Sequence, residues 1–141
     1  MARDQQGTSD ASGTPGIRIP GPLLVVDDDP AIRRMLTTFF TSRGARVLSA
    51  DSGEAALKQL AQGPAAVLLD VKMPGMDGLA TLRAMKATHP KLPVVMVSGV
   101  DDEETVNEAL RVGAYDYVTK PFSLEYLETV VLTKILVGVE G

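Results

Sequence analysis

Two hydrophobic patterns alternate along the chain, and this alternation constrains the fold more than any other feature. Short apolar runs of strand length, rich in Val and Leu, are separated by longer stretches whose apolar residues recur every three or four positions. The short runs are Leu23–Val26, Ala45–Leu48, Ala65–Leu69, Val94–Val97 and Tyr115–Val118. Strands that alternate with helices in this way predict parallel pairing through right-handed crossovers. We therefore expect an α/β fold, with a doubly wound five-stranded parallel sheet in a (βα)5 three-layer sandwich.

Capping residues support the predicted helix boundaries. Asp29 precedes Pro30, which is the pattern of an N-cap followed by proline at the first helical position. Glycines stand where several helices are expected to end, because glycine readily adopts the left-handed conformation of a helix C-terminus. The other predicted starts are at Asp51 or Ser52, at Asp77 and at 101–104, and the predicted stops are Gly44, Gly63 and Gly113.

The first 22 residues differ from the rest of the chain. They contain 4 Gly, 3 Pro and many small polar residues, with Ile17 and Ile19 as the sizeable apolar residues after Met1. Such a segment buries too little apolar surface to offset the entropy of ordering it. We expect a disordered tail over 1–22 and one folded domain over 23–141. Only 19 residues follow Phe122, enough for a last helix, so a second domain is not expected within the sequence.

Composition excludes several classes of function. Lys and Arg number 14 against 18 Asp and Glu, and the resulting charge of −4 disfavours binding to nucleic acid or to an anionic membrane. The chain has no Cys and one His, which removes disulfides, thiolate metal sites and multi-histidine sites. No apolar run approaches the ~20 residues of a membrane span, and the N-terminus does not resemble a secretory signal. A cytoplasmic protein is expected.

Chemically active side chains follow four of the five predicted strands. The first strand leads into Asp27-Asp28-Asp29, the third into Asp70, the fourth into Ser98 and the fifth into Lys120. In a doubly wound sheet, function lies beyond the carboxyl ends of the strands. Neighbouring carboxylates there repel one another, so Lys120 and a hard divalent cation such as Mg²⁺ (or Mn²⁺) are expected to compensate their charge. A cation beside a lysine is also suited to binding a phosphoryl group.

Four motifs in register resemble the receiver domain of bacterial two-component response regulators, the family that includes chemotaxis-type single-domain receivers. The resemblance covers about residues 23–137 and implies a flavodoxin-like fold. The motifs are Leu-Leu-Val-Val-Asp-Asp-Asp-Pro (23–30), Leu-Leu-Asp-Val-Lys-Met-Pro-Gly-Met-Asp-Gly (68–78), Pro-Val-Val-Met-Val-Ser-Gly (93–99) and Gly-Ala-Tyr-Asp-Tyr-Val-Thr-Lys-Pro-Phe (113–122).

The resemblance implies roles for the acids. Asp70 matches the phosphoacceptor, whose carboxylate takes a phosphoryl group from a histidine kinase or a histidine phosphotransfer protein. Asp28 and Asp70 would bind Mg²⁺ directly, and Asp27 would bind it through water. The backbone carbonyl of Lys72 would be a further ligand.

Four other residues also receive roles from the resemblance. Lys120 would pair with Asp70 at rest and with a phosphoryl oxygen afterwards, and the Lys120–Pro121 peptide bond would be cis. Ser98 would donate its hydroxyl to the phosphoryl group. Tyr117 matches the switch aromatic that turns inward when Ser98 moves, although an aromatic residue in a strand can also simply pack against a helix.

The output side follows from the same resemblance. Phosphorylation is expected to change the face formed by residues 101–137, which would control a partner protein or self-dimerisation. The last helix carries more apolar residues than one buried stripe needs, which fits either tighter packing or a docking surface. These residues are Val130, Val131, Leu132, Ile135, Leu136 and Val137. The protein would act on itself and would not turn over a separate substrate. The sequence leaves open whether it stands alone or belongs to a longer regulator.

Two alternatives compete with this interpretation. A haloacid-dehalogenase-like phosphohydrolase would use Asp27 as its nucleophile, but Ala31 stands where that class usually has Thr or Val, and no later strand supplies a further acidic pair. A pseudo-receiver would bind partners without taking phosphate. The full set of Asp27, Asp28, Asp70, Ser98 and Lys120 argues against it, because a module without the chemistry has no need of such a charge cluster.

Overall fold

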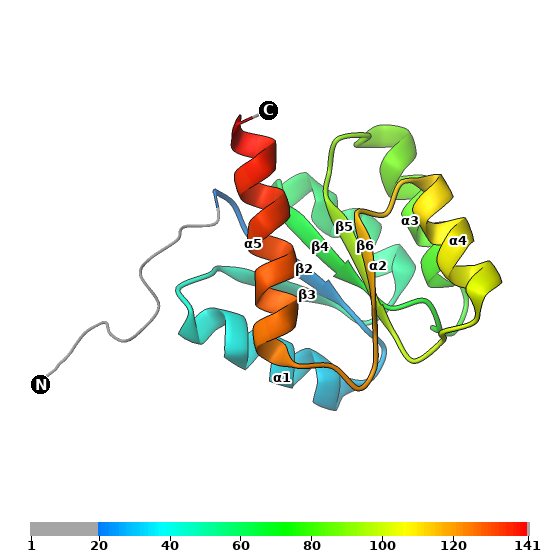
Figure 1. Ribbon diagram of the computed structural model, residues 1–141, viewed down its shortest axis with the longest axis horizontal. Coiled ribbons are helices and arrows are strands. Elements are labelled where there is room, and N and C mark those ends of the chain that lie inside the picture. The colour runs from blue at the N-terminus through cyan, green and yellow to red at the C-terminus, as the bar shows by residue number, and fades with distance from the viewer. Residues whose placement is uncertain (1–19, 141) are drawn as a thin grey trace, which may run out of the picture.

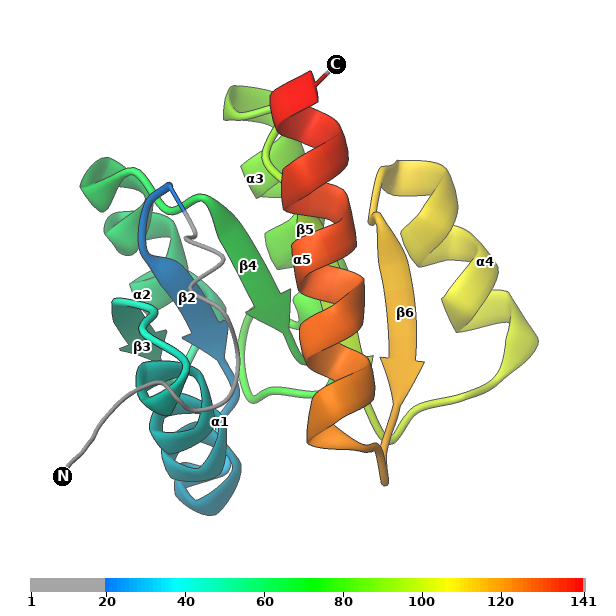
Figure 2. The same cartoon turned by 60° about the vertical axis from the view of Figure 1, so that its left-hand side comes forward.

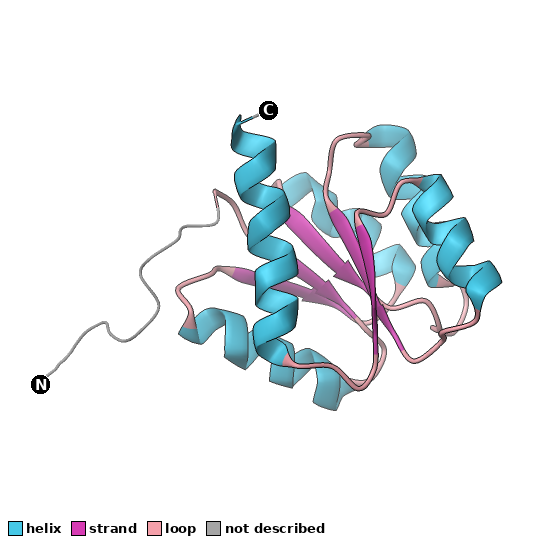
Figure 3. Ribbon diagram, viewed as in Figure 1, coloured by secondary structure: helices cyan, strands magenta, loops and turns pink. Residues whose placement is uncertain are grey.

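The computed structural model describes residues 20–140, with side chains described as far as residue 133. Within this range, five parallel strands form one sheet in the order β3-β2-β4-β5-β6 (Figure 1, Figure 3). The strands are β2 (Leu23–Val26), β3 (Val47–Ala50), β4 (Ala66–Leu69), β5 (Val94–Ser98) and β6 (Asp116–Thr119). This order is that of flavodoxin-like folds and confirms the predicted doubly wound sheet.

Helices cover both faces of the sheet. Helices α1 (Pro30–Ser42) and α5 (Leu124–Glu140) lie on one face, and α5 crosses in front of the strands in Figure 2. Helices α2 (Gly53–Gln59), α3 (Gly78–Thr88) and α4 (Glu103–Val112) cover the other face, and a short 3₁₀ turn, η1 (Leu60–Gln62), extends α2. The three layers follow from apolar strands that bury both of their faces.

Alternate residues of each central strand enter two separate cores. In β2, Leu24 and Val26 pack towards α2, α3 and α4, whereas Leu23 and Val25 pack towards α1 and α5. All four of these side chains are at most 1% exposed. The period of two along a strand thus divides a continuous apolar run between the faces of the sheet.

The predicted caps form as hydrogen bonds. Asp29 precedes α1 and its carboxylate accepts from the backbone N–H of Ala31 at 2.9 Å. Ser52, Asp77 and Asp102 cap α2, α3 and α4 in the same way. Gly44, Gly63 and Gly113 follow α1, η1 and α4 with φ values of 91°, 70° and 129°, the region that favours glycine.

The structure corrects two details of the sequence prediction. Strand β3 spans 47–50 and not 45–48, because its ladder with β2 runs from Leu23↔Val47 to Val26↔Ala50. Val130 and Val131 of α5 are buried in the core beside α1, so they are not part of an exposed apolar face. Ile135, Leu136 and Val137 lie outside the described side chains.

The described residues begin at Pro20, inside the segment 1–22 that was expected to be a tail. Most of the proposed tail, residues 1–19, lies outside the described residues. Pro22 is buried, and its carbonyl accepts a hydrogen bond from Ala65 N at 2.8 Å, which extends the backbone pairing in front of β2. No helix in the described part of the chain combines the length and the apolar character that crossing a membrane requires.

The sheet register determines where the acids meet. Val26 pairs with Leu69, so the residues that follow them, Asp27 and Asp70, leave the sheet side by side. The backbone N–H of Asp70 donates to Val26 O at 3.0 Å, which continues the ladder to the edge. These two strands flank the point where the strand order reverses, which is where doubly wound folds bind their ligands.

Candidate functional site

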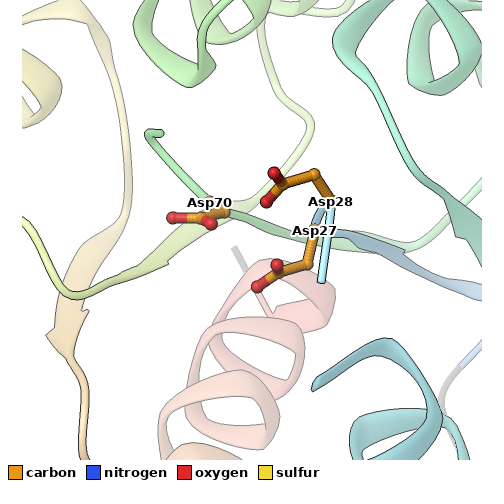
Figure 4. A group of neighbouring side chains, drawn as sticks. All are labelled: Asp27, Asp28 and Asp70. Atoms are coloured by element: carbon orange, nitrogen blue, oxygen red, sulfur yellow. The ribbon is translucent and has the colours of Figure 1, made fainter. Parts of the chain in front are cut away.

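Three carboxylates gather at this edge of the sheet. Asp27 and Asp70 are only 2% and 6% exposed, whereas Asp28 is exposed. One oxygen from each of the three lies within 4.8 Å of the others, and Figure 4 shows the three side chains directed to one side of the strand ends. Carboxylates this close raise each other's energy, and the group is a candidate site for a metal cation.

Lys120 supplies the positive charge of the site. Its ammonium is 2.9 Å from Asp27 Oδ2 and 3.6 Å from Asp70 Oδ2. The chain brings Lys120 there because β6 pairs with β5 as far as Thr119, after which Lys120 N donates to Ser98 O at 2.8 Å. The peptide bond between Lys120 and Pro121 is cis. One lysine compensates one of the three carboxylate charges, so the cluster keeps a net negative charge that suits a divalent cation.

The pKa values of Asp70 and Lys120 reflect the excess of negative charge in this cluster. Burial raises the pKa of Asp70, and the charge of Asp27 raises it further, while Lys120 and the Ser98 hydroxyl partly oppose the shift. Burial works against the charged form of Lys120. Its hydrogen bond to Asp27 and the charges of Asp27 and Asp70 outweigh that effect and raise the Lys120 pKa. Lys120 therefore stays protonated, and the pKa of Asp70 remains above its usual value because Lys120 compensates its charge only in part.

Ser98 and Tyr117 are linked through the backbone of Val100. Ser98 is fully buried, and its Oγ accepts a hydrogen bond from Val100 N at 3.1 Å. The Tyr117 hydroxyl donates to the carbonyl of the same Val100. Tyr117 is half-buried and packs against the core on the α3 and α4 side. Burial is the main cause that raises the pKa of Tyr117, so its hydroxyl keeps its proton at neutral pH.

The predicted site residues share one opening. Asp27, Asp28, Asp70, Ser98 and Lys120 all line an open depression of about 670 Å³. Lys72 and Val100 line it as well, and the backbone N–H of Lys72 donates to Asp70 Oδ1 over a long 3.4 Å. The Tyr117 side chain is not part of this lining, but its hydroxyl donates to the Val100 carbonyl and also interacts with Ser98.

Two residues that the sequence analysis did not assign to the site also shape it. Gly78 begins α3, and a Cβ at this position would lie 2.0 Å from the carbonyl oxygen of Asp70, so only glycine lets the helix approach the strand end this closely. Arg33 donates from Nη1 to the backbone carbonyl of Asp27 at 2.7 Å. The only signal for Arg33 in the sequence is its place about one helical turn after the Asp29 cap.

The chain's similarity to known proteins agrees with this geometry. Residues 23–132 match the response regulator receiver domain. The chain belongs to this family. Receiver domains are the phosphoacceptor signalling modules of two-component response regulators, so this receiver carries the function class that its motifs indicate.

Individual relatives refine the resemblance. The receiver is 42% identical over 110 residues to the regulatory protein AtoC of Escherichia coli (strain K12), covering 77% of this chain and 24% of that protein. It is 39% identical over 106 residues to the DNA-binding transcriptional regulator NtrC of Klebsiella pneumoniae, covering 74% and 23%. The receiver thus spans about a quarter of the length of these curated relatives. They are regulators of the NtrC and AtoC type, so the relatives do not single out the chemotaxis-type receivers named from the sequence.

Solved structures include both long and single-domain relatives. NtrX from Brucella abortus superposes with a TM-score of 0.79 at 36% identity, covering 84% of this chain and 27% of that chain. A CheY-like receiver domain protein from Methanospirillum hungatei JF-1 superposes with a TM-score of 0.83 at 26% identity, covering 85% and 97%. Receivers from both kinds of architecture therefore share this fold.

Proposed function

We propose that this receiver is a phosphorylation switch in which Asp70 accepts the phosphoryl group. The contacts of the two buried acids support this choice. Both oxygens of Asp27 are engaged at 2.9 Å, one by the backbone N–H of Asp29 and the other by Lys120. The Asp70 oxygens have longer contacts, 3.4 Å to Lys72 N and 3.6 Å to Lys120 Nζ, and the Ser98 hydroxyl also interacts with this carboxyl group. Asp70 is therefore the less tightly held carboxylate of the two, which favours it as the nucleophile.

The carboxylates would also hold a divalent cation. Asp28 and Asp70 would bind it directly, Asp27 through water, and the backbone carbonyl of Lys72 would complete the protein ligands. Oxygen donors with a net negative charge beside an open, water-accessible depression fit Mg²⁺ or Mn²⁺. When bound, the cation would neutralise part of the charge on the phosphoryl oxygens.

Phosphoryl transfer then follows from the arrangement of this chain's own groups. An Asp70 oxygen attacks the phosphorus of a phosphohistidine on a kinase or a phosphotransfer protein. A phosphorus–oxygen bond forms while the phosphorus–nitrogen bond breaks, and the imidazole nitrogen leaves with the electron pair. The Lys120 ammonium lies close enough to Asp70 to donate to a phosphoryl oxygen, and the Ser98 hydroxyl donates to another.

The output would pass through the face of residues 101–137. If the Ser98 side chain moves toward the phosphoryl group, its Oγ moves away from the Val100 N–H that donates to it. Val100 O also accepts from the Tyr117 hydroxyl, so both ends of this linkage would shift together. Three of the four exposed large hydrophobic residues in the described chain belong to this region. They are Leu110, Tyr115 and Tyr126, which are 43%, 37% and 54% exposed. Such a surface fits a downstream protein or a second copy of the receiver.

The test is intact mass after incubation with Mg²⁺ and acetyl phosphate. We expect one phosphoryl adduct on the wild type, none on Asp70→Asn, and an unchanged adduct on the matched variant Asp51→Asn, which alters an exposed aspartate away from the depression. An adduct that survives Asp70→Asn would contradict the assignment.

The alternatives give different results in the same assay. Turnover of phosphate esters that requires Asp27 would indicate a phosphohydrolase. A wild type that takes no phosphate from any donor would indicate a pseudo-receiver. The engaged oxygens of Asp27 disfavour the first, because short hydrogen bonds to both oxygens, one of them from an ammonium, make the carboxylate a weaker nucleophile.

A further inference from the structure

Arg33 links helix α1 to the loop that carries two of the acids. It is the fourth residue of α1 and is half-buried. Its Nη1 donates to the backbone carbonyl of Asp27 at 2.7 Å, six residues back along the chain. A guanidinium that donates to a carbonyl makes a charge-assisted hydrogen bond, which is short and directional.

The Asp27 carbonyl needs this partner because it lies just past the end of the strand. The preceding carbonyl, that of Val26, still accepts from Asp70 N in the ladder. The carbonyl two residues later, that of Asp29, already accepts from Arg33 N in the first turn of α1. The Asp27 carbonyl falls between the sheet and the helix, where neither pattern supplies a donor. A backbone carbonyl of a buried residue rarely stays unpaired, and the Arg33 side chain meets the need.

The bond from Arg33 completes the restraint of Asp27. The backbone N–H of Asp27 donates to Ala50 O at 3.2 Å. The Asp27 carboxylate oxygens accept from Asp29 N and from Lys120. With the carbonyl also held, the plane of the peptide between Asp27 and Asp28 has one orientation. This matters for Asp28, which is exposed and whose backbone N–H belongs to the same peptide.

We propose that Arg33 is a positioning residue for the cation site: by holding the Asp27 carbonyl, it keeps the Asp28 carboxylate within reach of Asp70. The inference rests on the proposed function, because it assumes that Asp27, Asp28 and Asp70 hold a divalent cation. Replacing a residue that holds a metal ligand in place without binding the metal commonly lowers metal affinity ten- to a hundredfold.

The sign of the effect separates positioning from simple electrostatics. Arg33 brings a positive charge close to an anionic site, so a purely electrostatic role predicts tighter cation binding when the charge is removed. A positioning role predicts weaker binding, because the Asp27–Asp28 peptide is then free to rotate. Arg34 is the matched control. It is the next residue of the same helix, is exposed, and lines a separate depression beside Met35 and Leu124.

The experiment measures Mn²⁺ affinity on the full chain by electron paramagnetic resonance. We expect Arg33→Met to weaken binding about tenfold. We expect Arg34→Met to leave it within about twofold of the wild type, on the tighter side because a cationic charge is lost. We expect Arg33→Lys, which keeps the charge and one donor, to fall between the wild type and Arg33→Met. In phosphorylation assays, Arg33→Met should need more Mg²⁺ for half-maximal rate and approach the wild-type rate at saturation.

The inference is overturned if Arg33→Met binds Mn²⁺ as tightly as Arg34→Met or more tightly. Thermal unfolding followed by circular dichroism checks that both variants fold. If Arg33→Met does not, the pair Arg33→Gln and Arg34→Gln gives the same comparison with the same loss of charge. A wild type that binds no Mn²⁺ overturns the proposed cation site itself, whereas a wild type that binds Mn²⁺ with no loss in the Arg33 variants overturns only the role of Arg33.

Discussion

Lys120 makes its shortest contact in the site with Asp27, at 2.9 Å, and lies 3.6 Å from Asp70. From the sequence, Asp70 was expected to be the resting partner of Lys120. The arrangement leaves Asp70 as the less compensated of the two buried acids, which agrees with its raised pKa. The arrangement would suit the proposed role of Asp70 as phosphoacceptor, because a carboxylate in close contact with an ammonium is a weaker nucleophile.

The first prediction concerns the charge of Asp27. Asp27→Asn removes a negative neighbour of Asp70 and frees Lys120 to approach it, and both changes favour the charged form of Asp70. The Asp70 pKa should therefore fall, as measured by carboxyl ¹³C NMR without divalent cation. Asp28→Asn is the control and should change it less, because Asp28 is exposed and solvent screens its charge. An Asp70 pKa that rises or stays constant in Asp27→Asn would contradict this account.

The second prediction tests the close approach of α3. In Gly78→Ala the new Cβ would lie 2.0 Å from the Asp70 carbonyl oxygen, and backbone atoms on both sides must move. We expect the free energy of unfolding, measured by urea denaturation, to fall by about 3 kcal/mol. Gly99→Ala should be close to neutral, since a Cβ at Gly99 meets nothing within 4 Å. Equal stabilities for the two variants would show that α3 can shift at little cost.

The third prediction concerns the lifetime of the phosphoryl group. Val100 lines the depression, and its apolar side chain offers no group to orient an attacking water. Val100→Glu and Val100→Asn should shorten the lifetime of the phosphorylated receiver, measured as loss of the mass adduct after the donor is removed. Val100→Leu should keep the wild-type lifetime, because the backbone bonds to Ser98 and Tyr117 do not involve the side chain. A longer lifetime in the polar variants would refute the idea.

The fourth prediction concerns stability against acid. Hydrogen bonds from the backbone and side chain of Thr105 lower the pKa of Asp102, the N-cap of α4. A lowered folded-state pKa means that Asp102 contributes stability above its unfolded value of 3.8 and loses that contribution as the pH falls through the folded value. Asp102→Ala should therefore be less stable than the wild type at neutral pH, and the difference should shrink as the pH falls below 3.8. Urea denaturation across this range measures it, and a constant difference would contradict the titration of Asp102.

Local patterns predicted the elements well, for physical reasons that are themselves local. The caps at Asp29 and Asp77 depend on contacts within three residues, so the sequence alone contains both partners of each hydrogen bond. The two-residue error in β3 arose at an edge strand. Its side chains are only partly buried, so apolar character marks its position poorly, and its limits depend on pairing with β2.

The sequence was sufficient to predict which residues gather at the site. Asp27, Asp70, Ser98 and Lys120 each lie at or directly after the carboxyl end of a strand, and the carboxyl ends of parallel strands share one edge. Their partners were not predictable in the same way. Arg33 bonds to a backbone carbonyl that any residue at position 27 would present, and Gly78 is required by a helix approaching from another layer. Neither contact leaves a pattern in the sequence.

The sequence by itself determined the fold class, the order of the elements and the group of side chains at the active edge, because hydrophobic periodicity, capping and chain order are local or topological properties. Only the tertiary structure decided which acid Lys120 contacts more closely, how closely α3 approaches Asp70, and that Arg33 donates to the Asp27 carbonyl. These depend on ångström-scale differences in packing between elements distant along the chain or between a side chain and a backbone group. Distances of that kind are set by how the layers fit together, and hydrophobic patterning carries no information about them.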